Sequence, residues 1–182
     1  MHLRKILTLD AKITGALRIQ EEQKSMRRVG TFFAHSGDSW FILLLLAFLW
    51  FFTNGEWRRL TILVGIAVII LALLVLSIKF LIKRRRPEGT WGAIYRNSDP
   101  HSFPSGHAAR TMMLGTLVLL LGYHWVGVIL IVWAVLVSLA RVGMGVHYFS
   151  DVFAGIILGG LFAIGFFNLT PWIITLVPAF FL

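Results

Sequence analysis

The chain has 182 residues, of which 58% are hydrophobic and only 14% are charged, and its mean hydropathy is +0.82. This balance excludes an ordinary soluble domain, because uncharged apolar runs of about 18 residues or more predict membrane-spanning helices. The net charge of +9 does not indicate a nucleic-acid binder, since the basic residues flank apolar runs, and an anionic lipid surface or an anionic substrate explains them more simply.

The first predicted element is an amphipathic helix within residues 1–28. Ile6, Leu9, Ile13 and Leu17 recur at helical spacing with basic residues between them, which is typical of a helix lying on a membrane surface. These apolar residues are too scattered to form the core of a signal peptide. A solvated basic tail is the alternative interpretation of this segment.

Five apolar segments follow, and each is expected to cross the membrane. Their approximate ranges are 38–53, 60–82, 105–121, 125–142 and 149–168. The residues from Pro171 onward are too few for a further full crossing, so they are expected to form an extension, a half-inserted segment or an interfacial piece. The sequence therefore predicts an all-α transmembrane helix bundle of about five to six spans, with residues 29–182 as one transmembrane domain behind the interfacial N-terminal helix.

The first polar motif, KFLIKRRRP at 79–87, ends the second apolar segment. If the helix continues to Arg86, then Lys79 and Arg86 lie about two turns apart on one face, and Pro87 ends the helix. The cations between them are expected to anchor the helix end at lipid headgroups: Lys83, Arg84 and Arg85. Headgroup anchoring would also explain Lys79 and Arg86 if the next two motifs were absent.

The second motif, PSGH at 104–107, comes directly before the third apolar segment. Pro104 or Ser105 can start a helix, Gly106 allows a ligand close to the backbone, and the amides of a helix N-terminus attract anions such as phosphate. His107 then stands in the first turn, beside anything bound there. Taken alone, this motif could equally be a helix cap with a histidine at the membrane interface.

The third motif, RVGMGVHYFSD at 141–151, connects the fourth and fifth apolar segments. His147 and Asp151 are four residues apart, so the carboxylate can accept one ring N–H and leave the other imidazole nitrogen with a free lone pair. Such a histidine can act as a nucleophile or a base. A purely structural His–Asp bond is the alternative. With sequential crossings, loops 83–104 and 142–148 lie on the same side of the membrane, so the three motifs can converge.

These three ordered motifs together resemble the type 2 phosphatidic acid phosphatase family of membrane lipid phosphatases, over roughly residues 30–168. Two features depart from the family pattern. Ala140 stands where the family usually has Ser, which removes a supporting hydroxyl but none of the catalytic groups. Typical six-span members have a crossing before the surface helix, whereas this sequence is expected to begin at that helix.

The resemblance implies a catalytic set and a phosphate-binding set. His147 would attack phosphorus and form a phosphohistidine, Asp151 would fix its tautomer, and His107 would protonate the leaving oxygen and later activate water. The nonbridging oxygens would be held by Lys79, Arg86, Arg141, the Ser105 side chain and the amides of Ser105 and Gly106. Three fixed cations can replace a metal, no carboxylate cluster suits magnesium, and there is no cysteine, so turnover without a metal or other cofactor is expected.

The expected substrate is a membrane lipid phosphate, because a site at the membrane face can reach a phosphate at headgroup depth. The family candidates are phosphatidic acid, phosphatidylglycerol phosphate, polyprenyl diphosphate and the 1-phosphate of lipid A. Arg110 and His101 could contact a second anionic group, or Arg110 could instead pair with Glu88 or Asp99. A noncatalytic lipid-phosphate binding or transport protein is the alternative function, while the apolar spans disfavour a soluble haloperoxidase with the same residues.

Two arguments about orientation conflict. All Lys and Arg residues except Arg58 and Arg59 lie on the side of the three motifs, and the positive-inside rule would make that side cytoplasmic. Phosphate and anionic lipid account for many of these charges, however, and the resemblance implies an outward-facing site. We therefore expect a multi-pass protein of a bacterial inner membrane with its site facing the periplasm. The sequence does not indicate an oligomeric state.

Overall fold

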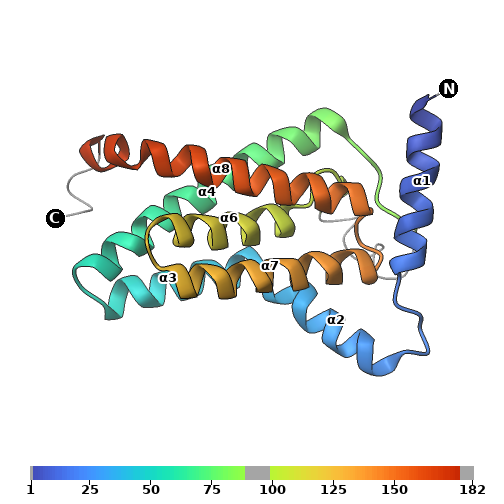
Figure 1. Ribbon diagram of the computed structural model, residues 1–182, viewed down its shortest axis with the longest axis horizontal. Coiled ribbons are helices and arrows are strands. Elements are labelled where there is room, and N and C mark those ends of the chain that lie inside the picture. Colours follow the sequence, from blue (N-terminus) through green and yellow to red (C-terminus); the bar gives the residue numbers. More distant parts are fainter. Residues whose placement is uncertain (1, 89–98, 177–182) are drawn as a thin grey trace.

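The computed structural model describes residues 2–88 and 99–176, and these ranges are helical apart from turns, extended connections and one isolated bridge between Arg85 and His101. The all-α prediction is confirmed for this part of the chain. In chain order the helices are α1 (His2–Leu17), α2 (Lys24–Ser36), α3 (Ser39–Phe52), α4 (Glu56–Ile82), α6 (Gly106–Leu120), α7 (His124–Gly143) and α8 (Phe149–Leu176) (Figure 1).

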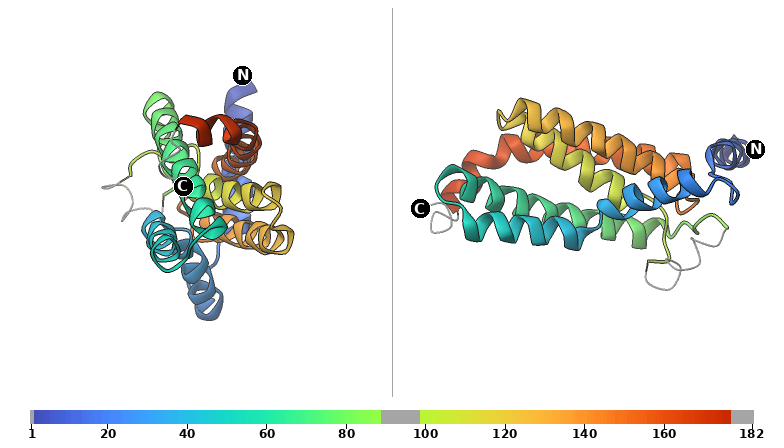
Figure 2. Two further views of the ribbon diagram at one scale, coloured as in Figure 1. Left: turned by 90° about the vertical axis from the view of Figure 1, so that its left-hand side faces the viewer. Right: turned by 90° about the horizontal axis from the view of Figure 1, so that it is seen from below.

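Helices α3, α4, α6, α7 and α8 run back and forth along the long axis of the molecule, and α1 lies across one end of them (Figure 1). Figure 2 shows the same arrangement from two further sides. The described parts of the connection from α4 to α6, residues 83–88 and 99–105, and the connection from α7 to α8 lie at the end where α1 lies. The predicted meeting of the second and fourth connections at one end is therefore confirmed.

Helices α4, α7 and α8 are long and apolar enough to cross a membrane, with 27, 20 and 28 residues. The pair α2 and α3, bent by 56° at its break, could form a fourth span. The predicted third segment forms α6, whose 15 residues extend only about 22 Å at the helical rise. The fifth segment extends beyond the predicted 168, because α8 continues through Pro171 to Leu176. Residues 177–182 lie outside the described part.

The predicted N-terminal helix ends earlier than residue 28. The α-helix stops at Leu17, because the next residues turn away and the Ile19 N–H donates to the Gly143 carbonyl at 2.8 Å, so residues 24–28 already belong to α2. In α1, Leu9 and Leu17 are exposed, while Asp10 and Thr14 are buried. The helix therefore contacts the bundle through polar side chains and leaves part of its apolar stripe uncovered.

Glycines let α8 approach α6 closely. A Cβ on Gly155 would lie 2.6 Å from the Ser105 carbonyl oxygen, and one on Gly159 would lie 2.1 Å from the Ala109 carbonyl oxygen. Small residues four apart commonly permit such close contact between transmembrane helices. The contact holds the start of α6, where the PSGH motif lies, against α8, which carries Asp151.

We expect Gly159→Ala to lower the free energy of unfolding by about 1–3 kcal/mol, because the added methyl would overlap backbone atoms that cannot move aside. Gly160→Ala is the matched control, since its Cβ would meet nothing within 4 Å. Thermal unfolding of both variants in detergent measures the difference. Equal melting temperatures for the two variants would contradict the close α6–α8 contact.

Candidate active site

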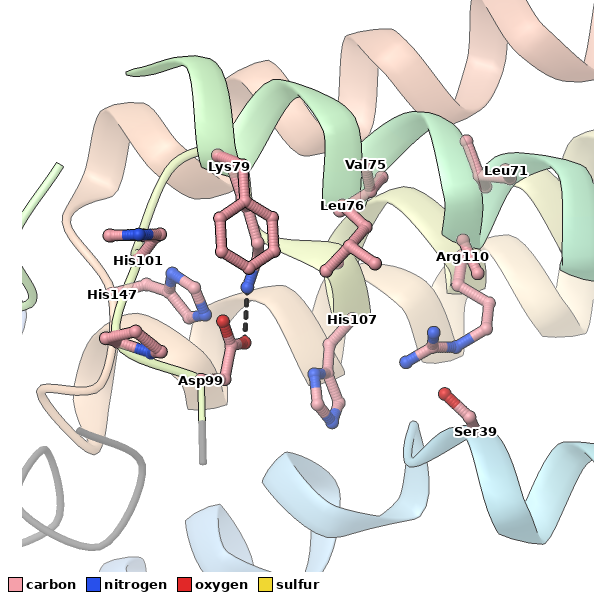
Figure 3. Close-up of a pocket in the computed structure, with 14 residues that line it drawn as sticks. Ser39, Leu71, Val75, Leu76, Lys79, Asp99, His101, His107, Arg110 and His147 are labelled. Atoms are coloured by element: carbon pink, nitrogen blue, oxygen red, sulfur yellow. Dashed lines mark hydrogen bonds and ion pairs between the residues drawn. The ribbon is translucent and has the colours of Figure 1, made fainter. Parts of the chain in front are cut away.

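A cavity of about 280 Å³ lies near the end of the bundle where the connections meet (Figure 3). Residues from α4 and α6, the start of α3 and the two connections line it. The polar part of its wall consists of Ser39, Lys79, Asp99, His101, His107, Arg110 and His147. Its apolar part includes Leu71, Val75 and Leu76, all from α4. The cavity thus joins a polar end to a wall suited to hydrocarbon.

His147 lies in the short connection before α8, and its side chain is buried. Arg86 Nη1 donates to His147 Nε2 at 3.1 Å, so Nε2 carries the lone pair and the proton belongs on Nδ1. On the other side of the ring, Nδ1 lies 3.5 Å from Asp151 Oδ2. This is longer than a formed hydrogen bond but close enough to become one after a small shift.

The pKa of His147 is lowered well below its ordinary value. Burial is the largest cause, because it disfavours the charged imidazolium, and the positive charges of Arg141, Arg86 and Lys79 act in the same direction. The imidazole is therefore neutral at physiological pH. The Nε2 lone pair accepts from Arg86 in this structure, and it can act as a nucleophile once Arg86 turns to another acceptor such as a phosphate oxygen.

Lys79 and Arg86 reach the site by a different route from the one predicted. The prediction that the helix continues to Arg86 is wrong: α4 ends at Ile82, and Lys83 takes a left-handed backbone conformation with φ of 51°. The chain beyond is extended, with the Ser102 N–H donating to the Arg84 carbonyl at 2.8 Å. Pairing with the segment before α6, rather than a shared helix face, positions Arg86.

The carboxylate of Asp99 is shared by two of the predicted phosphate-binding cations. It contacts Lys79 Nζ (Figure 3), and its Oδ2 also accepts from Arg86 Nη2 at 2.8 Å. Arg86 further donates Nε to the Asp99 carbonyl at 2.7 Å. The third cation, Arg141, is buried at the end of α7 and donates Nη1 to the Ala34 carbonyl at 3.3 Å. Lys79 and Arg86 therefore already converge on one anionic group.

The PSGH segment forms the start of α6. The Ser105 side chain is fully buried, and its Oγ has no hydrogen-bond partner among the described residues. The Ser105 N–H donates to the Asp151 carbonyl at 2.9 Å, which corrects the expectation that this amide is available to phosphate. The Ser105 hydroxyl and the Gly106 backbone remain as candidates for anion contact. A buried, unpartnered hydroxyl at the start of a helix is chemically suited to that role.

His107 has a carboxylate partner that the sequence interpretation missed. Its Nε2 lies 2.5 Å from Asp38 Oδ1, and Asp38 also contacts His35 Nδ1 at 3.3 Å. Asp38 lies at the bend between α2 and α3, as the first residue of the first predicted apolar segment. An acidic residue at that edge, three residues after a histidine, was the only sequence signal. With Nε2 engaged, Nδ1 is the nitrogen that His107 can offer to a ligand.

Arg110 is buried one turn beyond His107, on the cavity wall (Figure 3). Its Nη2 donates to the Gly37 carbonyl at 3.2 Å, and its Nε has no hydrogen-bond partner within the described residues. The alternative pairing of Arg110 with Glu88 or Asp99 is not found in that part of the chain. His101, also on the wall, packs edge-on against Phe80.

Arg84 is not the headgroup anchor that we predicted. It donates Nη1 to Asp151 Oδ1 at 2.7 Å and Nη2 to Asp10 Oδ2 at 2.6 Å, while its neighbours Lys83 and Arg85 are exposed. Sequence position does not distinguish Arg84 from Lys83 and Arg85, because the three cations are consecutive and chemically similar. Arg84 therefore contacts Asp151 and Asp10 in the interior instead of lipid headgroups.

The arrangement can bind a tetrahedral oxyanion between two imidazoles and several cations. His147, His107 and Lys79 line one cavity, and the positive charges of Arg86 and Arg141 act on His147 beside it. In residues 2–88 and 99–176, no group of three or more His, Cys, Asp or Glu side chains is arranged to hold a metal ion.

The chain is similar to several known proteins. The family model of the PAP2 superfamily matches residues 60–174. A crystal structure described as the first transmembrane PAP2 type phosphatidylglycerolphosphate phosphatase, from Bacillus subtilis, is 26% identical, with a TM-score of 0.75 over 93% of this chain and 88% of that one. The crystal structure of LpxE from Aquifex aeolicus is 24% identical, with a TM-score of 0.69 over 88% of this chain and 95% of that one. This likeness supports the fold.

Two curated relatives match shorter stretches. An undecaprenyl-diphosphatase of Sulfolobus acidocaldarius is 44% identical over 59 residues, and a lipid A 4'-phosphatase of Bacteroides thetaiotaomicron is 36% identical over 66 residues. These stretches are 32% and 36% of this chain, and each spans 29% of the length of the relative.

Proposed function

Since this chain belongs to the PAP2 superfamily of membrane lipid phosphatases, we propose that it hydrolyses a phosphate monoester or diphosphate on a membrane lipid through a phosphohistidine. One observation carries this proposal. His147 presents an Nε2 lone pair, held by Arg86, to the cavity that His107 also lines. A nucleophile and a proton donor at one anion site are what such a two-step reaction needs.

In the first step His147 Nε2 attacks phosphorus, the N–P bond forms and the bond to the leaving oxygen breaks. His107 gives that oxygen a proton from Nδ1, while Asp38 holds its Nε2. In the second step His107 takes a proton from water, the water oxygen bonds to phosphorus, and the N–P bond breaks. Asp151 stabilises the positive ring of His147 in both steps through Nδ1.

Lys79, Arg86 and Arg141 are proposed to bind the nonbridging oxygens, with help from the Ser105 hydroxyl and the Gly106 backbone. An arriving phosphate would displace the Asp99 carboxylate from Lys79 and Arg86, because phosphate offers more charge to the same two groups. With three cations in place, we propose that turnover needs no metal and no cofactor.

The proposed substrate lies with its phosphate at the polar end of the cavity and its hydrocarbon along Leu71, Val75 and Leu76 of α4. The relatives bear names of enzymes for phosphatidylglycerol phosphate, lipid A phosphate and undecaprenyl diphosphate. Together with phosphatidic acid, these four lipid classes are the candidates to be tested.

In the membrane, we propose five crossings by α3, α4, α6, α7 and α8, with α1 on the surface. The short α6 is surrounded by α4, α7 and α8, so its neighbours can cover the hydrocarbon depth that it does not span. We propose a bacterial inner membrane and a site open to the periplasm.

A phosphate-release assay on purified protein in detergent, with a chelator present, tests this proposal. Four lipids are compared: phosphatidic acid, phosphatidylglycerol phosphate, a polyprenyl diphosphate and lipid A. We expect release from at least one lipid by the wild type and none by His147→Ala, with both proteins folded. Release that depends on added metal would overturn the metal-free mechanism, and binding without release would favour the noncatalytic alternative.

Arg110 is expected to favour substrates with a second phosphate on the lipid side of the scissile one. It lies one turn beyond His107 toward the apolar wall and has an unpartnered Nε. Arg110→Gln should reduce kcat/KM for a polyprenyl diphosphate by about 10–100-fold, as expected for the loss of one charge-assisted contact, and for phosphatidic acid much less.

Comparing kcat/KM for the two lipids measures this preference directly. Arg110→Lys, which keeps the charge, should recover part of the loss, and Arg59→Gln at the opposite end of α4 should change neither value. Equal losses on both lipids would mean that Arg110 acts only through its bond to the Gly37 carbonyl.

A further inference from the structure

The polar face of α1 binds the first turn of α8. Thr14 Oγ accepts from the Phe149 N–H at 3.0 Å, and Asp10 Oδ1 accepts from the Ser150 N–H at 3.0 Å. These amides begin α8 and have no partner within that helix. A helix from the far N-terminus of the chain therefore caps α8 where Asp151 stands.

Arg84 joins α1 to Asp151. Its Nη2 donates to Asp10 Oδ2 at 2.6 Å, and its Nη1 donates both to Ser150 Oγ and to Asp151 Oδ1 at 2.7 Å. The Ser150 hydroxyl in turn donates to Asp10 Oδ2 at 2.6 Å. The guanidinium also stacks 4.0 Å above the Tyr148 ring. Contacts on several sides of Arg84 leave it little freedom to turn away from Asp151.

The two oxygens of Asp151 have separate partners. Oδ1 accepts from Arg84, whereas Oδ2 accepts from the Tyr148 N–H at 2.9 Å and faces His147 Nδ1. The Asp151 side chain is fully buried, so water cannot take the place of either partner. The direction in which Oδ2 points is set jointly by the Arg84 bond to Oδ1, the Tyr148 N–H bond to Oδ2 and a side-chain hydrogen bond from Ser102 to the same carboxylate.

We propose that Asp10 and Arg84 are positioning residues for the nucleophile: they hold Asp151 in the orientation that aligns His147, so that the surface helix α1 forms part of the site. The inference rests on the proposed role of His147. Neither residue lines the cavity, so neither is placed to touch substrate.

Charge balance explains why both residues are needed. Burial alone would raise the pKa of Asp10, but hydrogen bonds from Ser150 and Arg84 outweigh it and hold that pKa below its usual range, so Asp10 is a carboxylate. Arg84 then separates two buried negative charges. Without Arg84, Asp10 and Asp151 would repel each other across Ser150, and Asp151 could avoid the repulsion by turning away or binding a proton. Either change removes the support for Nδ1.

The kinetic test compares Arg84→Gln, Arg84→Lys and Asp10→Asn with Arg85→Gln, which removes a neighbouring exposed cation. We expect Arg84→Gln to lower kcat by about 10–100-fold, as for other residues that orient a functional group through its partner, with KM nearly unchanged. Asp10→Asn should lower kcat by a smaller factor, and Arg84→Lys should restore part of the kcat lost in Arg84→Gln. Arg85→Gln should have the kcat of the wild type.

A double variant separates positioning from simple structural support. If Arg84 acts through Asp151, adding Arg84→Gln to Asp151→Asn should cause no further loss of kcat. A full additional loss in that background, or a normal kcat for Arg84→Gln alone, would overturn the proposal. His147→Ala, measured beside them, shows whether the proposed function itself holds.

Imidazole ¹⁵N resonances provide a readout that does not need activity. In ¹⁵N-histidine-labelled protein the His147 signals are assigned by their loss in His147→Ala. We expect Arg84→Gln to shift both nitrogens of His147, and Arg85→Gln to leave them in place. Unshifted His147 signals in Arg84→Gln would refute the positioning role even if no substrate had been found.

Discussion

Replacing His147 with Ala should abolish turnover, with kcat falling by roughly 10⁴-fold or more, because the proposed nucleophile is the His147 Nε2 atom that Arg86 contacts. The phosphoenzyme should disappear as well. Labelling with a ³²P-lipid, followed by an acid quench and an alkaline quench, measures it, since a phosphohistidine survives alkali but not acid.

His124→Gln is the matched control for this variant, because His124 is exposed at the opposite end of the bundle. It should retain activity and the phosphoenzyme. A phosphoenzyme that persists in His147→Ala would assign the nucleophile to another residue. Normal phosphate release without any phosphoenzyme in the wild type would instead indicate direct attack by water.

Replacing His107 with Gln should slow hydrolysis of the lipid by about 10²–10⁴-fold, the range for loss of a general acid. The loss should be much smaller with 4-nitrophenyl phosphate, whose leaving group departs without a proton. Asp38→Asn should show the same dependence on the leaving group with a smaller loss, because Asp38 holds His107 Nε2 rather than contacting the leaving oxygen. Steady-state kinetics with both substrates measures these differences.

Lys79→Gln provides the contrast for the His107 variant. Lys79 is proposed to bind a nonbridging oxygen, so its loss should slow both substrates to a similar extent. If His107→Gln also slowed both substrates equally, His107 would be a binding residue, and the proton would have to come from elsewhere.

Much of the fold followed from hydropathy. The apolar segments near 60–82 and 125–142 became α4 and α7 with small changes at their ends, since a long uncharged run in a membrane has few alternatives to a helix. Helix ends were less predictable. Leu17 ends α1 and Ile82 ends α4 because the next residues pair with distant backbone, at Gly143 and at Ser102. Hydropathy contains no information about such long-range hydrogen-bond partners.

The candidate site was predictable as far as short spacings reached. His147 and Asp151 are four residues apart, and His107 directly follows Ser105 and Gly106, so local geometry brings these groups near one another whatever the bundle does. Arg86 was brought to His147 as predicted, but by an extended segment and not by a helix face. The predicted proximity of Arg86 to His147 was therefore correct, but the predicted helix through Arg86 was not.

Residue order alone was enough to indicate an all-helical membrane protein with two histidines and three cations suited to phosphate, because hydropathy and motif spacing act over a few residues. Packing decided the carboxylate partners: Asp38 with His107, Asp99 with Lys79, and Asp10 with Arg84. These pairs are 69, 20 and 74 residues apart. Such partners meet only when separate helices and connections assemble, and since every carboxylate attracts every cation, charge in the sequence does not identify which pairs will form.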